Sequence, residues 1–139
     1  MPYWIKINYE RSDYVIDLDR IGAFASAPHG KITFWLPNSA HQMIINQQND
    51  PKGYQEVQDY INQVSTNSLS GSWIRIIYER NEYLIDLNQI SSFCHSPNGK
   101  LTFWLPDSSI PIMLNDQKDS DTYHKILDYI QWKTGLSLL

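Results

Sequence analysis

The chain has 139 residues, of which 42% are hydrophobic, and this composition is typical of a globular protein rather than a disordered one. Its formal net charge is −4 and it contains no run of basic residues, which argues against a protein that binds the phosphates of a nucleic acid. It has no apolar stretch of about 18 residues, no secretory signal, and one cysteine that can form no internal disulfide, so we expect a cytoplasmic protein without a membrane span.

The first elements predicted are five short strands. Residues 4–10 alternate between apolar and polar side chains, which is typical of a half-buried strand. A turn at 11–13 should lead into a second strand at 14–18. Third, fourth and fifth strands are expected at 20–24, 31–36 and 42–46, and the loop at 27–30 contains both Pro and Gly.

A helix is predicted after the fifth strand. Tyr54, Val57, Ile61 and Val64 recur at helical spacing with polar residues between them, and Asp50-Pro51 is a typical helix start. The polar residues 65–72 are then expected to form a linker.

The second half of the chain repeats the first. The motif KITFWLP at 31–37 returns as KLTFWLP at 100–106, and roughly 28 of 61 positions are identical when 4–64 is aligned on 73–133 without a gap. The sequence therefore predicts an α+β fold made by tandem duplication, with repeat one at 1–66 and repeat two at 73–139. Each repeat should be an antiparallel meander of about five strands followed by one C-terminal amphipathic helix, and pseudo-two-fold symmetry should relate the two.

This order of elements resembles that of pleckstrin-homology-like domains and of some bacterial regulatory β modules, and the resemblance assigns no functional residue. The alternation also predicts which side chains form the core. These are Ile5, Ile7, Ile16, Leu18, Ile32, Phe34, Leu36, Val57 and Ile61, with Ile74, Ile76, Ile85, Leu87, Leu101, Phe103, Leu105, Ile126 and Ile130 as their counterparts.

The repeated motif carries the candidate interface. If Ile32 and Phe34 face the core, then Thr33 and Trp35 lie on the opposite face of the strand, as do Thr102 and Trp104 in the second copy. A Trp buries roughly 150–250 Å², so we expect both Trp faces to be covered, by the other repeat or by a second chain.

A weaker candidate ligand site consists of Arg11, Arg80, Asp17 and Asp86. The arginines recur in Glu-Arg pairs at the first hairpin of each repeat and could hold a carboxylate or phosphate, or could be solvated edge charges. The two aspartates recur in Ile-Asp-Leu and could form a carboxylate dyad, although hydrogen bonds to the backbone of a turn explain them better.

The sequence predicts no catalytic set, no metal site and no cofactor. Its four histidines do not recur between the repeats, and Cys94 beside His95 is not a zinc motif. The leading hypothesis is a non-enzymatic protein-interaction, assembly or regulatory module. Such a module would bind a protein partner or associate with itself as a homodimer. Nucleic acid is not expected as a partner. One alternative is single-stranded nucleic-acid binding on an aromatic sheet face. Another is a small hydrolase-type enzyme with its site at the cleft between the repeats.

Overall fold

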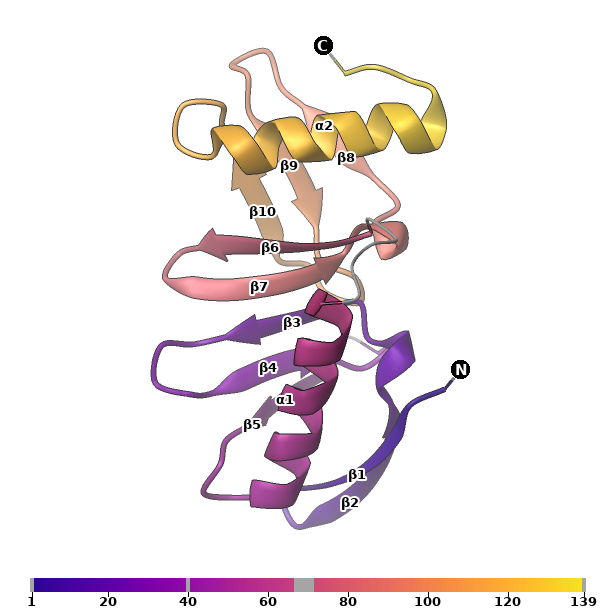
Figure 1. Ribbon diagram of the computed structural model, residues 1–139, viewed down its shortest axis with the longest axis vertical. Coiled ribbons are helices and arrows are strands. Elements are labelled where there is room, and N and C mark those ends of the chain that lie inside the picture. The colour runs from indigo at the N-terminus through magenta and orange to yellow at the C-terminus, as the bar shows by residue number, and fades with distance from the viewer. Residues whose placement is uncertain (1, 40, 67–71, 139) are drawn as a thin grey trace. The chain divides into compact units, whose positions relative to one another are not determined.

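The computed structural model describes residues 2–39, 41–66 and 72–138, and it is a mixed α+β fold with several antiparallel sheets (Figure 1). The first half contains β1 (Trp4–Tyr9), β2 (Ser12–Asp17), the 3-10 turn η1 (Leu18–Arg20), β3 (Ala23–Ser26), β4 (Ile32–Trp35), β5 (Gln42–Ile45) and α1 (Pro51–Thr66). The second half contains β6 (Trp73–Tyr78), β7 (Asn81–Asp86), η3 (Leu87–Gln89), β8 (Phe93–His95), β9 (Leu101–Trp104), β10 (Pro111–Leu114) and α2 (Ser120–Thr134). The same order of elements thus occurs twice.

The chain forms two compact units whose boundaries differ from those of the sequence repeats. The first unit comprises residues 1–89 and 105–109, and the second comprises 90–104 and 110–139. The hairpin of β6 and β7 therefore belongs to the first unit although it opens the second repeat. Of the predicted linker at 65–72, residues 67–71 lie outside the described residues, and 65–66 are the end of α1.

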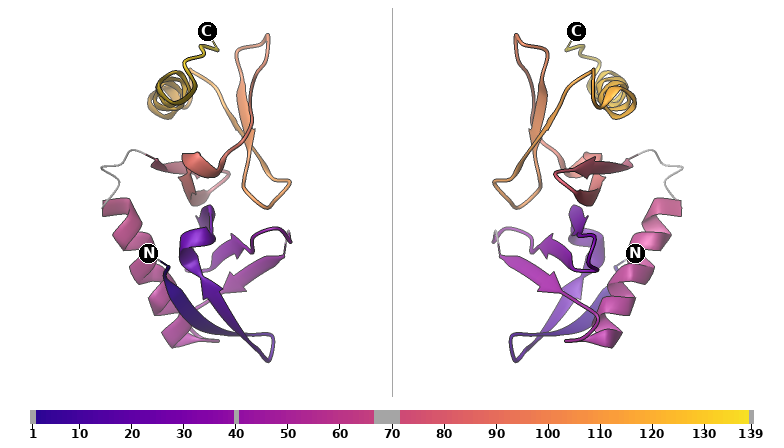
Figure 2. Two further views of the ribbon diagram at one scale, coloured as in Figure 1. Left: turned by 90° about the vertical axis from the view of Figure 1, so that its right-hand side faces the viewer. Right: turned by 90° about the vertical axis from the view of Figure 1, so that its left-hand side faces the viewer.

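The first unit contains a two-stranded sheet, β1-β2, and a five-stranded sheet of order β5-β4-β3-β7-β6. Helix α1 runs alongside both of these sheets, as Figures 1 and 2 both show. Burial alternates along β1, where Ile5 and Ile7 face inward and their neighbours face solvent, because successive side chains of a strand point to opposite faces. The predicted core residues are buried in both units, apart from Leu36, which is half-buried.

The pairing of β3 corrects the prediction of one five-stranded meander in each repeat. Strand β3 pairs with β4 on one side and with β7 of the other repeat on its second side, with Phe24 opposite Leu84. The turn η1 separates β2 from β3, so β3 does not continue the β1-β2 hairpin and its second edge takes β7 instead. The third strand also begins later than predicted, at Ala23 rather than residue 20, because residues 18–20 form η1.

The second unit is a three-stranded sheet, β10-β9-β8, covered by α2 (Figure 1). The Tyr123 hydroxyl of α2 lies 3.1 Å from the Gly99 carbonyl oxygen, to which it donates, and 2.9 Å from His95 Nε2. Gly99, at φ 85°, closes the β8–β9 loop in a left-handed conformation that glycine adopts without steric cost. Helix α2 ends at Gly135, which is also left-handed.

Candidate functional site

Two β-hairpins carry the same Glu-Arg pair at their tips. Glu10 and Arg11 have φ angles of 49° and 70°, and Glu79 and Arg80 have angles of 49° and 71°. Each pair thus occupies both central positions of a two-residue turn of the type I′ kind, where Asn and Gly are the residues that fit best. The turn lies at 10–11 rather than at the predicted 11–13. Non-glycine residues in left-handed backbone cost stability and concentrate at functional sites, so these tips are candidate binding elements.

The two tip arginines differ from other basic residues of the hairpins in their pairing. Lys6 lies 3.8 Å from Asp13, and Arg75 lies 2.9 Å from Glu82. Within the described part of the chain, Arg11 and Arg80 have no ion-pair partner, and both are exposed. Their guanidinium groups are therefore free to bind an anion.

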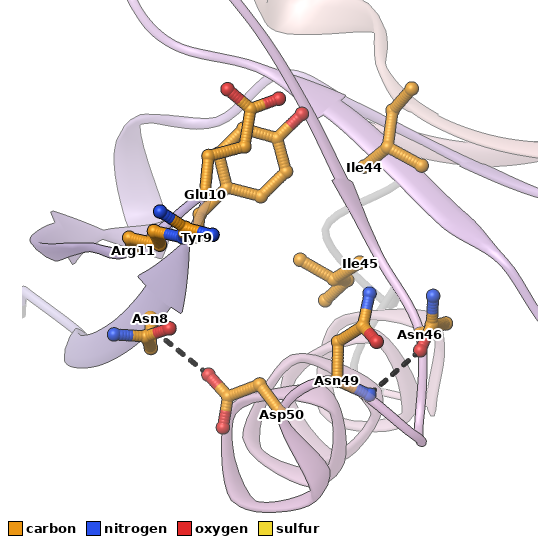
Figure 3. A pocket seen from close by; sticks show the side chains of 9 residues that line it. All are labelled: Asn8, Tyr9, Glu10, Arg11, Ile44, Ile45, Asn46, Asn49 and Asp50. Carbon is orange, nitrogen blue, oxygen red and sulfur yellow. Dashed lines mark hydrogen bonds between the residues drawn. The ribbon is translucent and has the colours of Figure 1, made fainter.

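Arg11 lies at a pocket of about 490 Å³ between the tip of β1-β2 and the segment that joins β5 to α1 (Figure 3). The Asp50 carboxylate holds the two sides together. It accepts hydrogen bonds from the Asn8 backbone N–H at 2.9 Å and from the Gly53 N–H at 3.0 Å, so it also caps α1. The lining residues are Asn8, Tyr9, Glu10, Arg11, Ile44, Ile45, Asn46, Asn49 and Asp50.

Arg80 lies at a second pocket of about 400 Å³, which we call the Gln58 pocket. It is formed where β3, α1 and the β6-β7 hairpin meet, so it depends on the pairing of β3 with β7. The Gln58 Oε1 atom is fully buried and has no hydrogen-bond partner among the described residues. The lining residues are Ser26, Ala27, Pro28, Gln58, Ile61, Asn62, Arg75, Ile77, Arg80, Asn81 and Glu82.

The two predicted aspartates are engaged in backbone hydrogen bonds. Asp17 Oδ1 accepts from the N–H groups of Tyr3 and Asp19, and Asp86 Oδ1 accepts from the N–H of Asn88. These are the bonds that the turn interpretation requires. The described residues contain no hydrogen bond between Asp17 and Asp86, and the structure does not bring them together with Arg11 and Arg80 into one site.

Asp19 has a second role, as the hydrogen-bond acceptor of a buried tyrosine. The Tyr60 hydroxyl donates to Asp19 Oδ1 at 2.8 Å. Burial raises the pKa of Tyr60 well above its ordinary value, and the hydrogen bond and the negative charge of Asp19 raise it further.

The residues of the repeated motif are in different environments. Trp35 is 6% exposed, whereas Trp104 is 42% exposed, and Thr33 and Thr102 are half-buried. Within the chain itself Trp35 is thus covered and Trp104 is not, so coverage of Trp104 by a second chain stays a prediction. Each tryptophan ends an internal strand, Trp35 in the five-stranded sheet of the first unit and Trp104 in the three-stranded sheet of the second unit.

The described residues contain neither a cluster of metal-ligating side chains nor a helix that could span a membrane. No group of three or more His, Cys, Asp or Glu side chains among them is placed to hold a metal ion. None of the helices in the described ranges is long and apolar enough to cross a membrane.

Neither a scan of known protein families nor a search of curated proteins finds a match to the sequence. Among solved structures, the fold is similar to the LytTr DNA-binding domain of a response regulator from Bacillus cereus. The TM-score is 0.51, the sequences are 5% identical, and the alignment covers 88% of this chain and 95% of that domain. The structural neighbour is thus a LytTr-like fold rather than the pleckstrin-homology-like one that the order of elements suggested.

This likeness corrects two interpretations of the sequence. The first is the protein-interaction, assembly or regulatory module with a protein partner or self-association. The second is the exclusion of nucleic acid, since the same β-rich fold occurs in a DNA-binding domain. The negative net charge is no ground for excluding nucleic acid, because it sums the whole surface, whereas binding depends on which charges lie together.

Proposed function

We propose that this protein binds nucleic acid and that Arg11 and Arg80 contact phosphates. The observation that carries the proposal is the fold-level likeness of 88% of the chain to a LytTr DNA-binding domain. The two arginines support it because they lie at exposed hairpin tips without ion-pair partners in the described structure. A guanidinium group matches the geometry of a phosphate with two parallel hydrogen bonds.

The exposed end of β9 offers a second kind of contact. Trp104 is 42% exposed, and Thr102 lies on the same face of the strand because side chains two residues apart share a face. An exposed indole can stack on an unpaired base without regard to its identity. This supports the single-stranded form of the proposal, in which Trp104 and Thr102 belong to the aromatic face.

The number of phosphate contacts sets how the binding depends on salt. Phosphate contacts release counterions, so the logarithm of the association constant falls linearly with the logarithm of salt concentration. Because the proposal assigns phosphate contacts to two arginines and the net charge is negative, we expect binding to be measurable at low ionic strength and weak between about 50 and 200 mM salt.

The test is the salt dependence of binding to labelled single-stranded and duplex DNA, measured by fluorescence anisotropy for the wild type, Arg11→Ala and Arg80→Ala. Each variant should bind more weakly, and each should reduce the slope of log K against log salt by about one, since one phosphate contact is lost. Lys6→Ala is the matched control, because it removes one positive charge from the Arg11 hairpin at a residue that is already paired with Asp13.

The control should leave the slope within error of the wild-type value. Absence of salt-dependent binding to either form of DNA at low ionic strength would refute the proposal. A slope that is unchanged in Arg11→Ala and Arg80→Ala would refute the role of the tips.

The proposal also includes the origin of the fold by duplication. We infer that the halves at 1–66 and 73–139 are copies of one ancestral unit. Support comes from the repeated order of elements. The predicted pseudo-two-fold symmetry does not extend to the sheets, because β3 pairs with β7 whereas the corresponding strands β8 and β2 are not paired among the described residues. The cytoplasm is the proposed location.

A further inference from the structure

The outward face of α2 carries a row of basic and aromatic side chains, which we call the α2 stripe. It consists of Lys125, Tyr129, Trp132 and Lys133. The other three residues each lie three or four positions from Tyr129, and residues at this spacing are neighbours on the surface of a helix. The buried residues of α2 are on its opposite face, and they are Tyr123, Ile126, Leu127 and Ile130.

The α2 stripe is open to solvent at three of its four positions. Trp132 is 74% exposed, and its ring lies beside that of Tyr129 with the centroids 6.1 Å apart. Lys125 and Lys133 are exposed, and neither has an ion-pair partner within the described ranges. Exposed apolar surface with polar groups at its rim is typical of a binding site.

Helix α1 shows that the fold forms without such a stripe. The counterparts of the stripe residues, at the repeat offset of 69 positions, are Glu56, Tyr60, Gln63 and Val64. On this face α1 has one acid and no base, and its tyrosine is buried in the core, whereas α2 has two bases and an exposed indole. Asp128 borders the stripe, but its counterpart on α1 is Asp59, so it does not contribute to the difference. The stripe of α2 therefore suits an anionic ligand with apolar rings.

A single strand of nucleic acid has this chemistry. Proteins bind single strands with aromatic side chains on which bases stack and with positive charges that contact phosphates. Lys125 and Lys133 are about 12 Å apart along the helix axis, at 1.5 Å per residue, so one strand can reach both lysines and the indole. An anionic membrane surface is a poorer match, because its recognition uses clusters of about four to eight basic residues.

We propose that the α2 stripe binds an unpaired stretch of nucleic acid, with a base stacked on Trp132 and phosphates on Lys125 and Lys133. The inference rests on the proposed function and deepens it, because it names a surface that prefers unpaired bases. In a duplex the bases are stacked on one another, so a duplex can use the lysines but not the indole.

The experiment measures binding of the full chain to labelled oligo(dT) and to a labelled dA·dT duplex, by fluorescence anisotropy at low salt. Trp132→Ala should weaken the binding of oligo(dT) by about fivefold or more, as for the loss of one stacked base, and should leave duplex binding unchanged. Trp132→Phe should keep most of the affinity because it retains a ring, whereas Trp132→Leu should lose it. The melting temperature should be the same in all three variants, since the side chain is exposed.

The double variant Lys125→Ala/Lys133→Ala tests the phosphate contacts. It should reduce the slope of log K against log salt for oligo(dT) by about 1.4, since each contact with a single strand contributes about 0.7. Lys118→Ala is the matched control, because it removes one exposed positive charge of the second unit that lies outside α2. Gln131→Ala is the control on α2 itself, exposed but off the stripe, and both controls should retain the wild-type affinity and slope.

The outcomes distinguish this inference from the proposed function. DNA binding that neither Trp132→Ala nor the double lysine variant changes overturns the α2 stripe and leaves the proposed function intact. Absence of binding to both forms of DNA refutes the two together. Equal weakening of oligo(dT) and duplex by Trp132→Ala overturns the stacked base. Binding to vesicles of phosphatidylcholine and phosphatidylserine that requires Trp132, without any effect of Trp132 on oligo(dT), assigns the stripe to a membrane surface and overturns the inference.

Discussion

At the scale of single residues, Tyr60 shows how burial and one hydrogen bond combine. The side chain is 4% exposed, and its hydroxyl donates to Asp19 at 2.8 Å. Tyr3 and Phe24 pack against its ring, with ring centroids at 4.9 and 5.9 Å. The phenolate form is disfavoured in this environment because it would be desolvated and would face the carboxylates of Asp19, Asp86 and Asp17.

The raised pKa of Tyr60 predicts a loss of stability in alkali that Tyr60→Phe removes. Folded Tyr60 keeps its proton while the unfolded side chain loses it above about pH 10, so the unfolded state binds fewer protons and stability falls as pH rises. The slope for this one group approaches about 1.4 kcal/mol per pH unit. Urea denaturation of both proteins between neutral pH and pH about 11 measures the difference.

At neutral pH the wild type should be more stable than Tyr60→Phe by about 1 kcal/mol, the typical value of one hydrogen bond. Above pH 10 this advantage should shrink. Parallel stability curves over the whole alkaline range would contradict the raised pKa of Tyr60, because all other titrating groups are common to the two proteins.

At the scale of elements, the two helices begin differently although their sequences correspond. Asp50 caps α1 through the Gly53 N–H and also accepts the Asn8 N–H of β1. Asp119, its counterpart, makes no capping bond from its side chain among the described residues, and it accepts the Asn115 N–H at 3.3 Å. Asp50 therefore connects α1 to the β1-β2 hairpin, whereas Asp119 closes the turn before α2.

This difference predicts that replacing each aspartate by alanine destabilises the protein to a different extent. Asp50→Ala should cost about 1–2 kcal/mol, since a cap is lost and the Asn8 N–H is left without its partner. Asp119→Ala should cost less, about 0.5 kcal/mol or below. Thermal melting of the two variants measures this, and equal losses would show that Asp50 contributes no more than its counterpart.

Much of each element could be predicted from the sequence, because period and capping are local properties. The strands at 4–9 and 32–35 and both helices follow directly from the spacing of apolar residues. The predicted start of the third strand was too early, because Asp17 caps the 3-10 turn η1 and β3 begins only at Ala23. Period reports which face of a strand is buried and not which strand lies beside it, so the pairing of β3 with β7 could not be predicted.

The candidate binding residues could be predicted from the sequence only in part. Arg11 and Arg80 stand out because they recur at predicted turns. Gln58 does not, because a polar residue between Val57 and Ile61 on a helix is typical of a solvated face. Its burial follows from the β6-β7 hairpin, which reaches this part of α1 only through a pairing of distant segments.

At the scale of the whole molecule, the pairing of β3 with β7 makes equivalent residues unequal. Val15 of β2 and Leu84 of β7 correspond in the two repeats, and both lie in the second strand of a Glu-Arg hairpin. Val15 is 68% exposed, whereas Leu84 is 5% exposed and lies in the core cluster that contains Phe24 and Phe34. A residue of the second repeat thus completes the core of the first unit.

We therefore expect Leu84→Ala to destabilise the first unit strongly and Val15→Ala to have little effect. Truncating a buried Leu typically costs 2–5 kcal/mol, because apolar burial is lost and a cavity remains, whereas an exposed substitution changes stability by less than about 0.5 kcal/mol. Denaturant unfolding followed by far-UV circular dichroism measures both. If the two repeats were instead closed meanders of their own, β7 would have no β3 beside it and the two variants would lose stability to similar extents. Equal losses would therefore refute the five-stranded sheet, and with it the Gln58 pocket that this pairing creates.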